Sequence, residues 1–136
     1  MFFKRKKGPR SKATAAKRRE IRELDNLVRE IVFVRDEFKC VRCGRSREQG
    51  YKLDPSHILP KGTYPRMRFE VSNVLTMCSG VCHRDWHDNP LGQDWFDVAY
   101  PGRQLELQIM ARCAPRVDFK LLKLVLTQTL ASWQKP

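Results

Sequence analysis

Apolar side chains recur every three or four residues over residues 14–35, with charged residues between them. This spacing places the apolar side chains along one side of a helix. The apolar positions are Ile21, Leu24, Leu27, Val28 and Ile31. The pattern predicts an amphipathic N-terminal helix.

A second helical pattern begins after Asp118, whose side chain can cap a helix. One side of it carries Phe119, Leu122, Val125 or Leu126, and Leu130, and the stripe is widened by Leu121, Leu124 and Trp133. So broad an apolar surface should be buried against the rest of the chain or against a second copy of it. Residues 91–99 and 104–112 predict two shorter helices, separated by Pro101 and Gly102.

The central part of the chain has short apolar runs bounded by turn residues. Residues 38–43 and 53–59 are expected to form two ribbon strands, with a tight turn at Cys43 and Gly44. Residues 60–65 are rich in glycine and proline and predict a loop. A helix should begin near Cys82, so the expected order is strand, strand, helix.

Four of the five cysteines and all three histidines fall between residues 40 and 87. The cysteines form two pairs far apart in sequence, namely Cys40 with Cys43 and Cys78 with Cys82. Two such pairs are typical of a tetrahedral zinc site, in which each pair holds the ion from its own turn. The second pair has three intervening residues where two are usual. The pattern predicts a structural Zn²⁺ bound by these four cysteines.

The length of 136 residues suits one small domain, to which a structural metal would add useful stability. Five cysteines leave one unpaired in any disulfide scheme, and no apolar leader follows Met1. No run of residues is long and apolar enough for a membrane span. We therefore expect a reducing, cytoplasmic setting.

The formal net charge is +12, and residues 1–19 hold nine of the 27 basic residues and no acidic one. We expect residues 1–13 to be a basic arm that is disordered until it meets a polyanion. A cluster of positive charges without acidic residues favours nucleic acid as the partner. The alternative is a tail that only improves solubility.

Several segments resemble a known family in order and spacing. They are residues 38–44 (FKCVRCG), 54–60 (DPSHILP), 72–75 (SNVL) and 78–83 (CSGVCH). Together they are similar to the cysteine-flanked His-Asn-His (HNH) endonucleases of the ββα-metal superfamily. Within that group, the chain most resembles the phage recombination nucleases of the lambda NinG (Rap) type. This likeness rests on Asp54 and His57, followed by Lys61 and Gly62, Pro65, Arg68 and Phe69, Asn73 and a cysteine pair. The likeness covers residues 38–90 and does not extend to the flanking helices.

The resemblance implies an α+β fold with a small zinc-stapled ββα-metal core flanked by amphipathic helices. One nuclease domain would then span residues 14–136. Within it we expect a helix at residues 14–36, the zinc and HNH core at residues 37–90, and C-terminal helices at residues 91–136.

The resemblance also assigns roles. His57 is the expected general base, because a neutral imidazole near pH 7 can take a proton from water. Asn73 is the expected orienting residue, with its side-chain carbonyl accepting a hydrogen bond from His57; it could instead cap a turn. His83 and His87, one helical turn apart, are the expected ligands of a catalytic Mg²⁺ or Mn²⁺. All three imidazoles should then meet across one pocket.

The third metal ligand is less well defined by the sequence. Family members often carry Asp or His immediately before the base, whereas this chain has Ser56 there and Asp54 three residues before His57. Asp54 is the expected ligand, with a bulge needed to bring it to the ion.

Three basic residues in and after the loop, Lys61, Arg66 and Arg68, are expected to contact DNA phosphates. The aromatic residues Trp86, Trp95 and Phe96 are expected to serve packing, and Cys113 to lie in the core.

The resulting hypothesis is a metal-dependent DNA endonuclease that acts on branched recombination intermediates, such as Holliday junctions or displacement loops, in a phage-infected bacterial cell. A homodimer would suit symmetric incision. Two alternatives stay open: a general or nicking phage HNH endonuclease without junction preference, and a non-catalytic, zinc-dependent nucleic-acid-binding module.

Overall fold

The computed structural model describes residues 12–134. Its longest element is helix α1, Lys12–Arg35. Its inner face carries Leu24, Val28, Ile31 and Val32, all buried. The predicted N-terminal helix is therefore confirmed. Most of the predicted basic arm, residues 1–11, lies outside the described residues.

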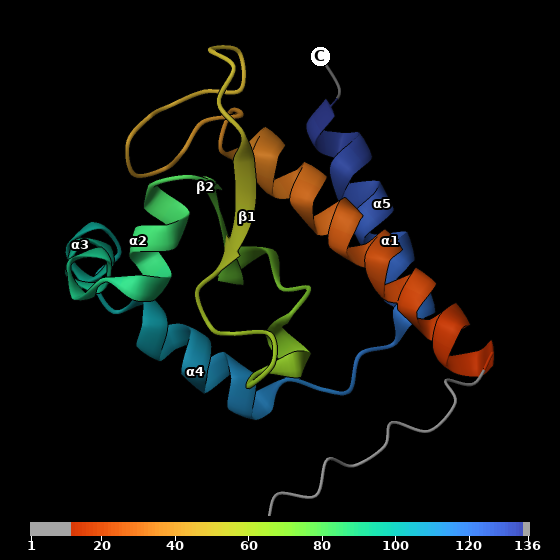
Figure 1. Ribbon diagram of the computed structural model, residues 1–136. Coiled ribbons are helices and arrows are strands. Elements are labelled where there is room, and N and C mark those ends of the chain that lie inside the picture. Colours follow the sequence, from red (N-terminus) through yellow and green to blue (C-terminus); the bar gives the residue numbers. More distant parts are fainter. Residues whose placement is uncertain (1–11, 135–136) are drawn as a thin grey trace, which may run out of the picture.

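Helix α5, Phe119–Gln134, lies alongside α1 (Figure 1). The backbone N–H of Leu121 donates to Asp118 Oδ1 at 3.1 Å, which confirms the predicted cap. Leu126 is buried in this contact. On the outer side Leu121, Leu124 and Val125 remain exposed. Helix α1 thus covers only part of the broad apolar stripe of α5.

The sheet is a two-stranded antiparallel ribbon of β1, Leu53–His57, and β2, Val74–Cys78. Its register pairs Leu53 with Cys78 at one end and His57 with Val74 at the other. The ribbon lies between α1 on one side and α2, Cys82–Asp88, on the other (Figure 1). The structure thus has mixed helix and sheet, with five helices described in residues 12–134.

The expected strand at residues 38–43 is wrong, and the partner of β1 is residues 74–78 instead. Residues 38–43 are wound into turns, because the backbone N–H of Cys40 donates to Arg45 O and that of Gly44 donates to Cys40 O. Gly44 has a φ of +76°, a left-handed conformation that glycine adopts without strain. Every residue of β2 is buried, as suits an apolar strand covered on both faces.

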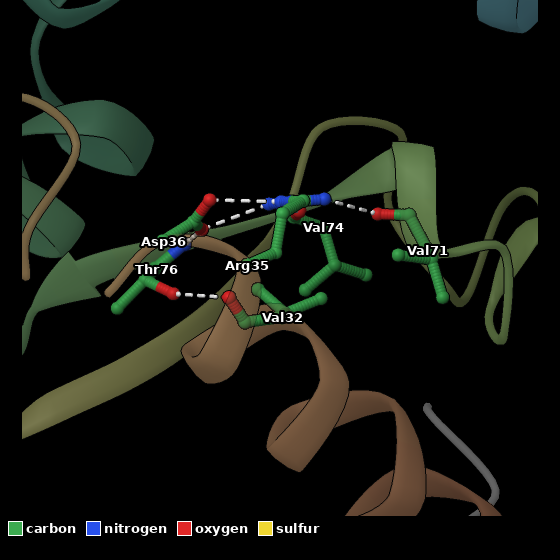
Figure 2. A network of polar contacts seen from close by, with 6 residues as sticks. All are labelled: Val32, Arg35, Asp36, Val71, Val74 and Thr76. Carbon is green, nitrogen blue, oxygen red and sulfur yellow. Dashed lines mark hydrogen bonds and ion pairs between the residues drawn. The ribbon is translucent and has the colours of Figure 1, made fainter. Parts of the chain in front are cut away.

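A polar network joins the end of α1 to the ribbon (Figure 2). Arg35 donates to the backbone carbonyls of Val71, at 2.9 Å, and Val74, at 2.7 Å, and to the Asp36 carboxylate. Asp36 also accepts the backbone N–H of Thr76 at 3.0 Å. These bonds satisfy polar backbone groups at the edge of β2 and fix where the ribbon sits on α1.

The 3₁₀ turns Pro65–Met67 and Val71–Asn73 lie between the two strands. After α2 come α3, Pro90–Ala99, and α4, Arg103–Cys113, near the predicted positions. No helix among residues 12–134 is long and apolar enough to cross a membrane.

Helices α2 and α3 approach each other closely at Gly92. A Cβ atom at this position would lie 2.5 Å from the carbonyl oxygen of Asp85 in α2, so no larger residue fits without a shift. Trp86 and Trp95 pack on the buried ring of Phe96, as expected. Cys113 was expected in the core but is exposed at the end of α4.

Candidate functional site

The four paired cysteines come together from three elements. Cys40 and Cys43 lie in the turns after α1, Cys78 ends β2, and Cys82 begins α2. Their sulfur atoms all lie within 4.8 Å of one another, and the Cys43 and Cys78 Sγ atoms are 3.8 Å apart. Tetrahedral thiolates about 2.3 Å from Zn²⁺ lie roughly 3.8 Å from each other. The four cysteines can therefore hold a metal ion such as zinc.

The three-residue gap between Cys78 and Cys82 is explained by the turn from β2 into α2. The backbone N–H of Cys82 points back to Cys78 Sγ at 3.4 Å, so the start of the helix places both sulfurs on one side. The unusual spacing is thus compatible with a four-cysteine site.

The surroundings of the site favour a thiolate at Cys78. Burial opposes its ionisation, but hydrogen bonds from Cys82, Cys43 and Arg45 outweigh burial and lower the pKa of the Cys78 thiol to about 7. Burial raises the pKa of the Cys43 and Cys82 thiols. One thiol is therefore ready to ionise near neutral pH, and a bound cation would be needed to ionise its neighbours.

An ion pair joins the Cys40–Cys43 turn to α2. Arg42 binds Asp85, which lies between the two histidines of α2, and its guanidinium also lies 5.3 Å from the centre of the Trp95 ring. The Arg42 hydrogen bond lowers the pKa of the Asp85 carboxyl. This contact fixes the orientation of α2 relative to the cysteine site.

A second cluster of ligand-type side chains lies on the other side of α2's first turn. His83 Nδ1 donates to Asp54 Oδ2 at 3.0 Å, and the Nε2 atoms of His83 and His87 are 3.1 Å apart. Burial works against the charged form of Asp54, yet the hydrogen bond from His83 lowers the pKa of this carboxyl. Burial, and then the charge of His83, lower the pKa of His87.

The distance between the two Nε2 atoms fits joint binding of one cation. Two nitrogens about 2.0–2.1 Å from a metal, at roughly a right angle, lie about 3 Å apart. With its proton on Nδ1, His83 presents the Nε2 lone pair toward His87, and His87 does the same when its proton is on Nδ1. A carboxylate behind a ligating histidine orients the ring and raises its basicity.

Asp54 therefore stands behind His83 in this arrangement, and no bulge brings it there, because it pairs with Met77 in the regular register. Ser56, the alternative ligand, is buried, and its Oγ has no hydrogen-bond partner among the described residues. Within residues 12–134, only the four cysteines bring three or more ligand atoms all within 4.8 Å of one another. The cluster of Asp54, His83 and His87 is the more open of the two.

His57 is the last residue of β1, and its ring is held by the loop that follows. Its Nε2 lies 2.9 Å from the backbone carbonyl oxygen of Arg68, so Nε2 carries the proton and Nδ1 the free lone pair. Burial, with the nearby charges of Lys61 and Arg68, lowers the pKa of His57. The ring is thus neutral at neutral pH, as a general base must be.

Among the described residues, no hydrogen bond or ring contact joins His57 directly to either of the other two imidazoles. The ring and hydrogen-bond contacts of His83 are with Asp54 and His87, whereas His57 contacts the loop carbonyl of Arg68. The structure thus brings Asp54, His83 and His87 into contact, while His57 at the end of β1 contacts the backbone of the following loop.

The expected contact between Asn73 and His57 is replaced by a different one. Asn73 is fully buried, and its Oδ1 accepts the backbone N–H of Leu59 at 2.8 Å. Its Nδ2 donates to the carbonyls of Leu59 and Met67. The carboxamide thus closes the loop after β1, and the Arg68 carbonyl, which no sequence signal singles out, orients His57.

The three predicted DNA-binding residues differ in their contacts. Lys61 is exposed. Arg66 donates to the carbonyl of Ala114 at 2.9 Å. Arg68 is engaged by Asp25 of α1 through two hydrogen bonds, of 2.9 and 2.6 Å. Arg68 therefore has a structural partner already, while Lys61 is the most available of the three.

Comparison with known proteins adds no assignment: no protein-family model matches this chain, and no match was found among curated proteins or solved structures.

Proposed function

We propose that this protein is a metal-dependent DNA endonuclease that hydrolyses phosphodiester bonds. The observation that carries the proposal is the pair of Nε2 atoms of His83 and His87, 3.1 Å apart, with Asp54 bound to the far nitrogen of His83. Helix α2 carries the two histidines of this open cluster and also supplies Cys82 to the complete four-cysteine site. One closed site and one open site are what a structural ion and a catalytic ion require.

The residues divide the chemistry as follows. His83 and His87 would hold Mg²⁺ or Mn²⁺, which supplies positive charge to the phosphate oxygens and to the departing 3′ oxygen. His57 accepts the proton of the attacking water at Nδ1, because the Arg68 carbonyl occupies Nε2. Asp54 fixes the ring of His83. Cleavage in this way leaves 5′-phosphate and 3′-hydroxyl ends.

The arrangement of the histidines sets a geometric requirement on the substrate. His57 ends β1 and the histidine pair lies on α2, so in this proposal the scissile phosphate has to lie between the end of β1 and α2. Branched DNA, such as a Holliday junction or a displacement loop in phage recombination, is the proposed substrate. It is supported by the likeness of residues 38–90 to the NinG-type nucleases.

A homodimer is proposed for symmetric incision of such a junction. The exposed residues Leu121, Leu124 and Val125 on α5 offer an apolar surface for it.

Cleavage of matched DNAs tests the proposal. Purified protein is incubated with Mg²⁺ or Mn²⁺ and with linear, nicked and four-way DNAs of the same sequence. The wild-type protein is expected to cut, with the four-way DNA preferred, and His57→Ala to cut about 10²–10⁴-fold more slowly. Equal cutting of all DNAs would remove the junction preference and leave a general nuclease.

Because His57 also forms a hydrogen bond with the loop carbonyl of Arg68, its substitution needs a folding control. The zinc content and the circular dichroism of His57→Ala should match those of the wild type, since no cysteine contact involves this ring. A folded His57→Ala that cuts at the wild-type rate would contradict the role of general base.

A second candidate is a non-catalytic, zinc-dependent nucleic-acid-binding module. It is favoured by the position of His57, which contacts neither His83 nor His87 among the interactions of the described residues. Metal counting separates the two functions. Tight zinc alone, without any cleavage, supports the binding module, whereas zinc plus a weaker, exchangeable divalent ion supports the nuclease.

A further inference from the structure

A groove of about 580 Å³ lies next to the loop that holds His57. It is bordered by α1, by the loop between the strands and by the connection from α4 to α5. Five of its ten lining residues are basic, and none is acidic; the basic ones are Lys17, Lys61, Arg66, Arg68 and Arg116. We call it the basic groove.

Most of the charge in the basic groove is uncompensated. Arg68 is paired with Asp25, but Lys17, Lys61, Arg66 and Arg116 make no ion pair with an acidic residue among the interactions of the described residues. All four are exposed. Four uncompensated cations around one concave surface attract a polyanion.

The floor of the groove is apolar and partly aromatic. Phe69 and Phe119 meet edge to face, with ring centres 6.2 Å apart, and the Nζ of Lys17 lies 6.0 Å from the centre of the Phe119 ring. Basic rims over aromatic side chains are typical of surfaces that follow a nucleic-acid strand, because the rings contact sugars or bases while the cations contact phosphates.

The basic groove shares Arg68 with the contacts of His57. The carbonyl of Arg68 contacts His57 at 2.9 Å, and the side chain of Arg68 lines the groove. Lys61 lies between the two in sequence and also lines the groove. A strand that passes His57 therefore meets these cations next.

We propose that the basic groove binds the DNA backbone leading away from the cleavage site, with Lys17 of α1 and Arg116 of the α4–α5 connection as DNA-binding residues. The inference rests on the proposed nuclease function for the identity of the strand. It assigns substrate contacts to the flanking segments, which lie outside the ribbon and α2. A backbone ligand suits the groove because its repeating charge matches four cations, whereas base-specific contacts would need polar groups that the floor does not have.

DNA binding without added catalytic metal tests the groove separately from cleavage. The anisotropy of a short labelled DNA duplex is measured at several salt concentrations with the full-length, zinc-loaded protein. The double variant Lys17→Gln with Arg116→Gln should bind at least about fivefold more weakly. Its salt dependence, as the slope of log K against log salt, should fall by roughly two, since each phosphate contact contributes about 0.9.

The matched control removes the same charge elsewhere. Arg18 is the next residue of α1, and Arg112 lies near the end of α4; both are exposed and neither lines the groove. The variant Arg18→Gln with Arg112→Gln should change the affinity and the slope clearly less. If both double variants lose affinity and slope equally, the effect is one of net charge, and the proposal that the groove binds DNA is overturned. A further competition uses polyglutamate at the same total charge concentration as the DNA. If polyglutamate displaces the DNA from the wild-type protein, the groove proposal is overturned in favour of an acidic protein ligand.

The two proposals fail in different ways. If the groove variant binds and cuts as the wild type does, the groove inference is wrong and the nuclease proposal stands. If no DNA is cut under any condition but the groove variant still loses affinity and slope, the nuclease proposal is wrong and the groove stands as a DNA-binding surface.

Discussion

The two ligand clusters on helix α2 differ in how completely their side chains enclose a metal position. The four cysteine sulfurs all lie within 4.8 Å of one another, and three of the four residues are buried. Asp54, His83 and His87 instead form a chain of contacts, with His87 exposed at its end. The first cluster fills four coordination positions with protein atoms, whereas the second leaves positions open.

The difference shows how one short helix can serve two purposes. Cys82 starts α2 and belongs to the closed cluster, and the next residue, His83, belongs to the open one. Any ion held by the cysteines therefore fixes the first turn of the helix that presents the histidines. The two clusters are coupled through this one turn, and the following predictions separate them.

The largest effect is expected from breaking the closed cluster. Cys78→Ser should abolish cooperative thermal unfolding and reduce zinc content from one ion per chain to none. Structural zinc contributes about 10–16 kcal/mol in small domains, as much as the total stability of a typical domain. Circular dichroism measures the unfolding transition, and elemental analysis measures the zinc content.

The control is Cys113→Ser, which removes an exposed thiol outside the cluster and should leave the zinc content and the melting temperature unchanged. A cooperative, zinc-free Cys78→Ser would contradict a structural role for the ion.

A smaller effect is expected from loosening the open cluster. Asp54→Asn should weaken Mn²⁺ binding about 10–100-fold, because the carboxylate orients and polarises His83 from behind. His87→Ala should weaken it further, and both variants should keep their zinc and fold. Calorimetric titration with Mn²⁺ measures the affinity. Asp94→Asn, which changes an exposed carboxylate in the neighbouring helix α3, is the matched control and should bind like the wild type. Unchanged Mn²⁺ binding in both His87→Ala and Asp54→Asn would show that no divalent ion binds there.

The smallest effect concerns pH and His57. Its pKa in the folded protein is below the ordinary value of about 6.5, so the unfolded chain binds a proton more readily. The stability that depends on neutral His57 is therefore fully present above pH about 6.5 and declines as the pH falls from there to the folded pKa. Urea midpoints above and below this pH should differ less for His57→Gln than for the wild type. An identical pH dependence in the two proteins would show that the ring is not held in the neutral form.

The helices and the cysteine site could be predicted from sequence because their signals are local or strongly patterned. Apolar spacing gave α1 and α5, and Asp118 marked the start of α5. Two cysteine pairs gave the four-sulfur cluster. By contrast, β2 is the short, mostly apolar segment VLTMC, in which every residue is buried, so it has no alternation to distinguish a strand.

The parts that could not be predicted depend on long-range contacts. Arg35 and Asp36 bind groups some 40 residues further along the chain, and nothing near them in sequence signals this. The contact of His57 with the Arg68 carbonyl also depends on the folded loop, because 11 residues separate the two in sequence. The contact of Asn73 with the loop, in place of His57, follows from the close approach of Leu59 and Met67 in the folded chain.

The carboxamide of Asn73 has a consequence for how this protein can diversify. It binds both backbone groups of Leu59 and the carbonyl of Met67, so it fastens the two ends of the intervening loop to the start of β2. The residues suspended between these points can change in sequence or number while the ribbon keeps its register. Substitutions at a few loop positions can therefore change the binding specificity of related chains, provided that Asn73 is retained.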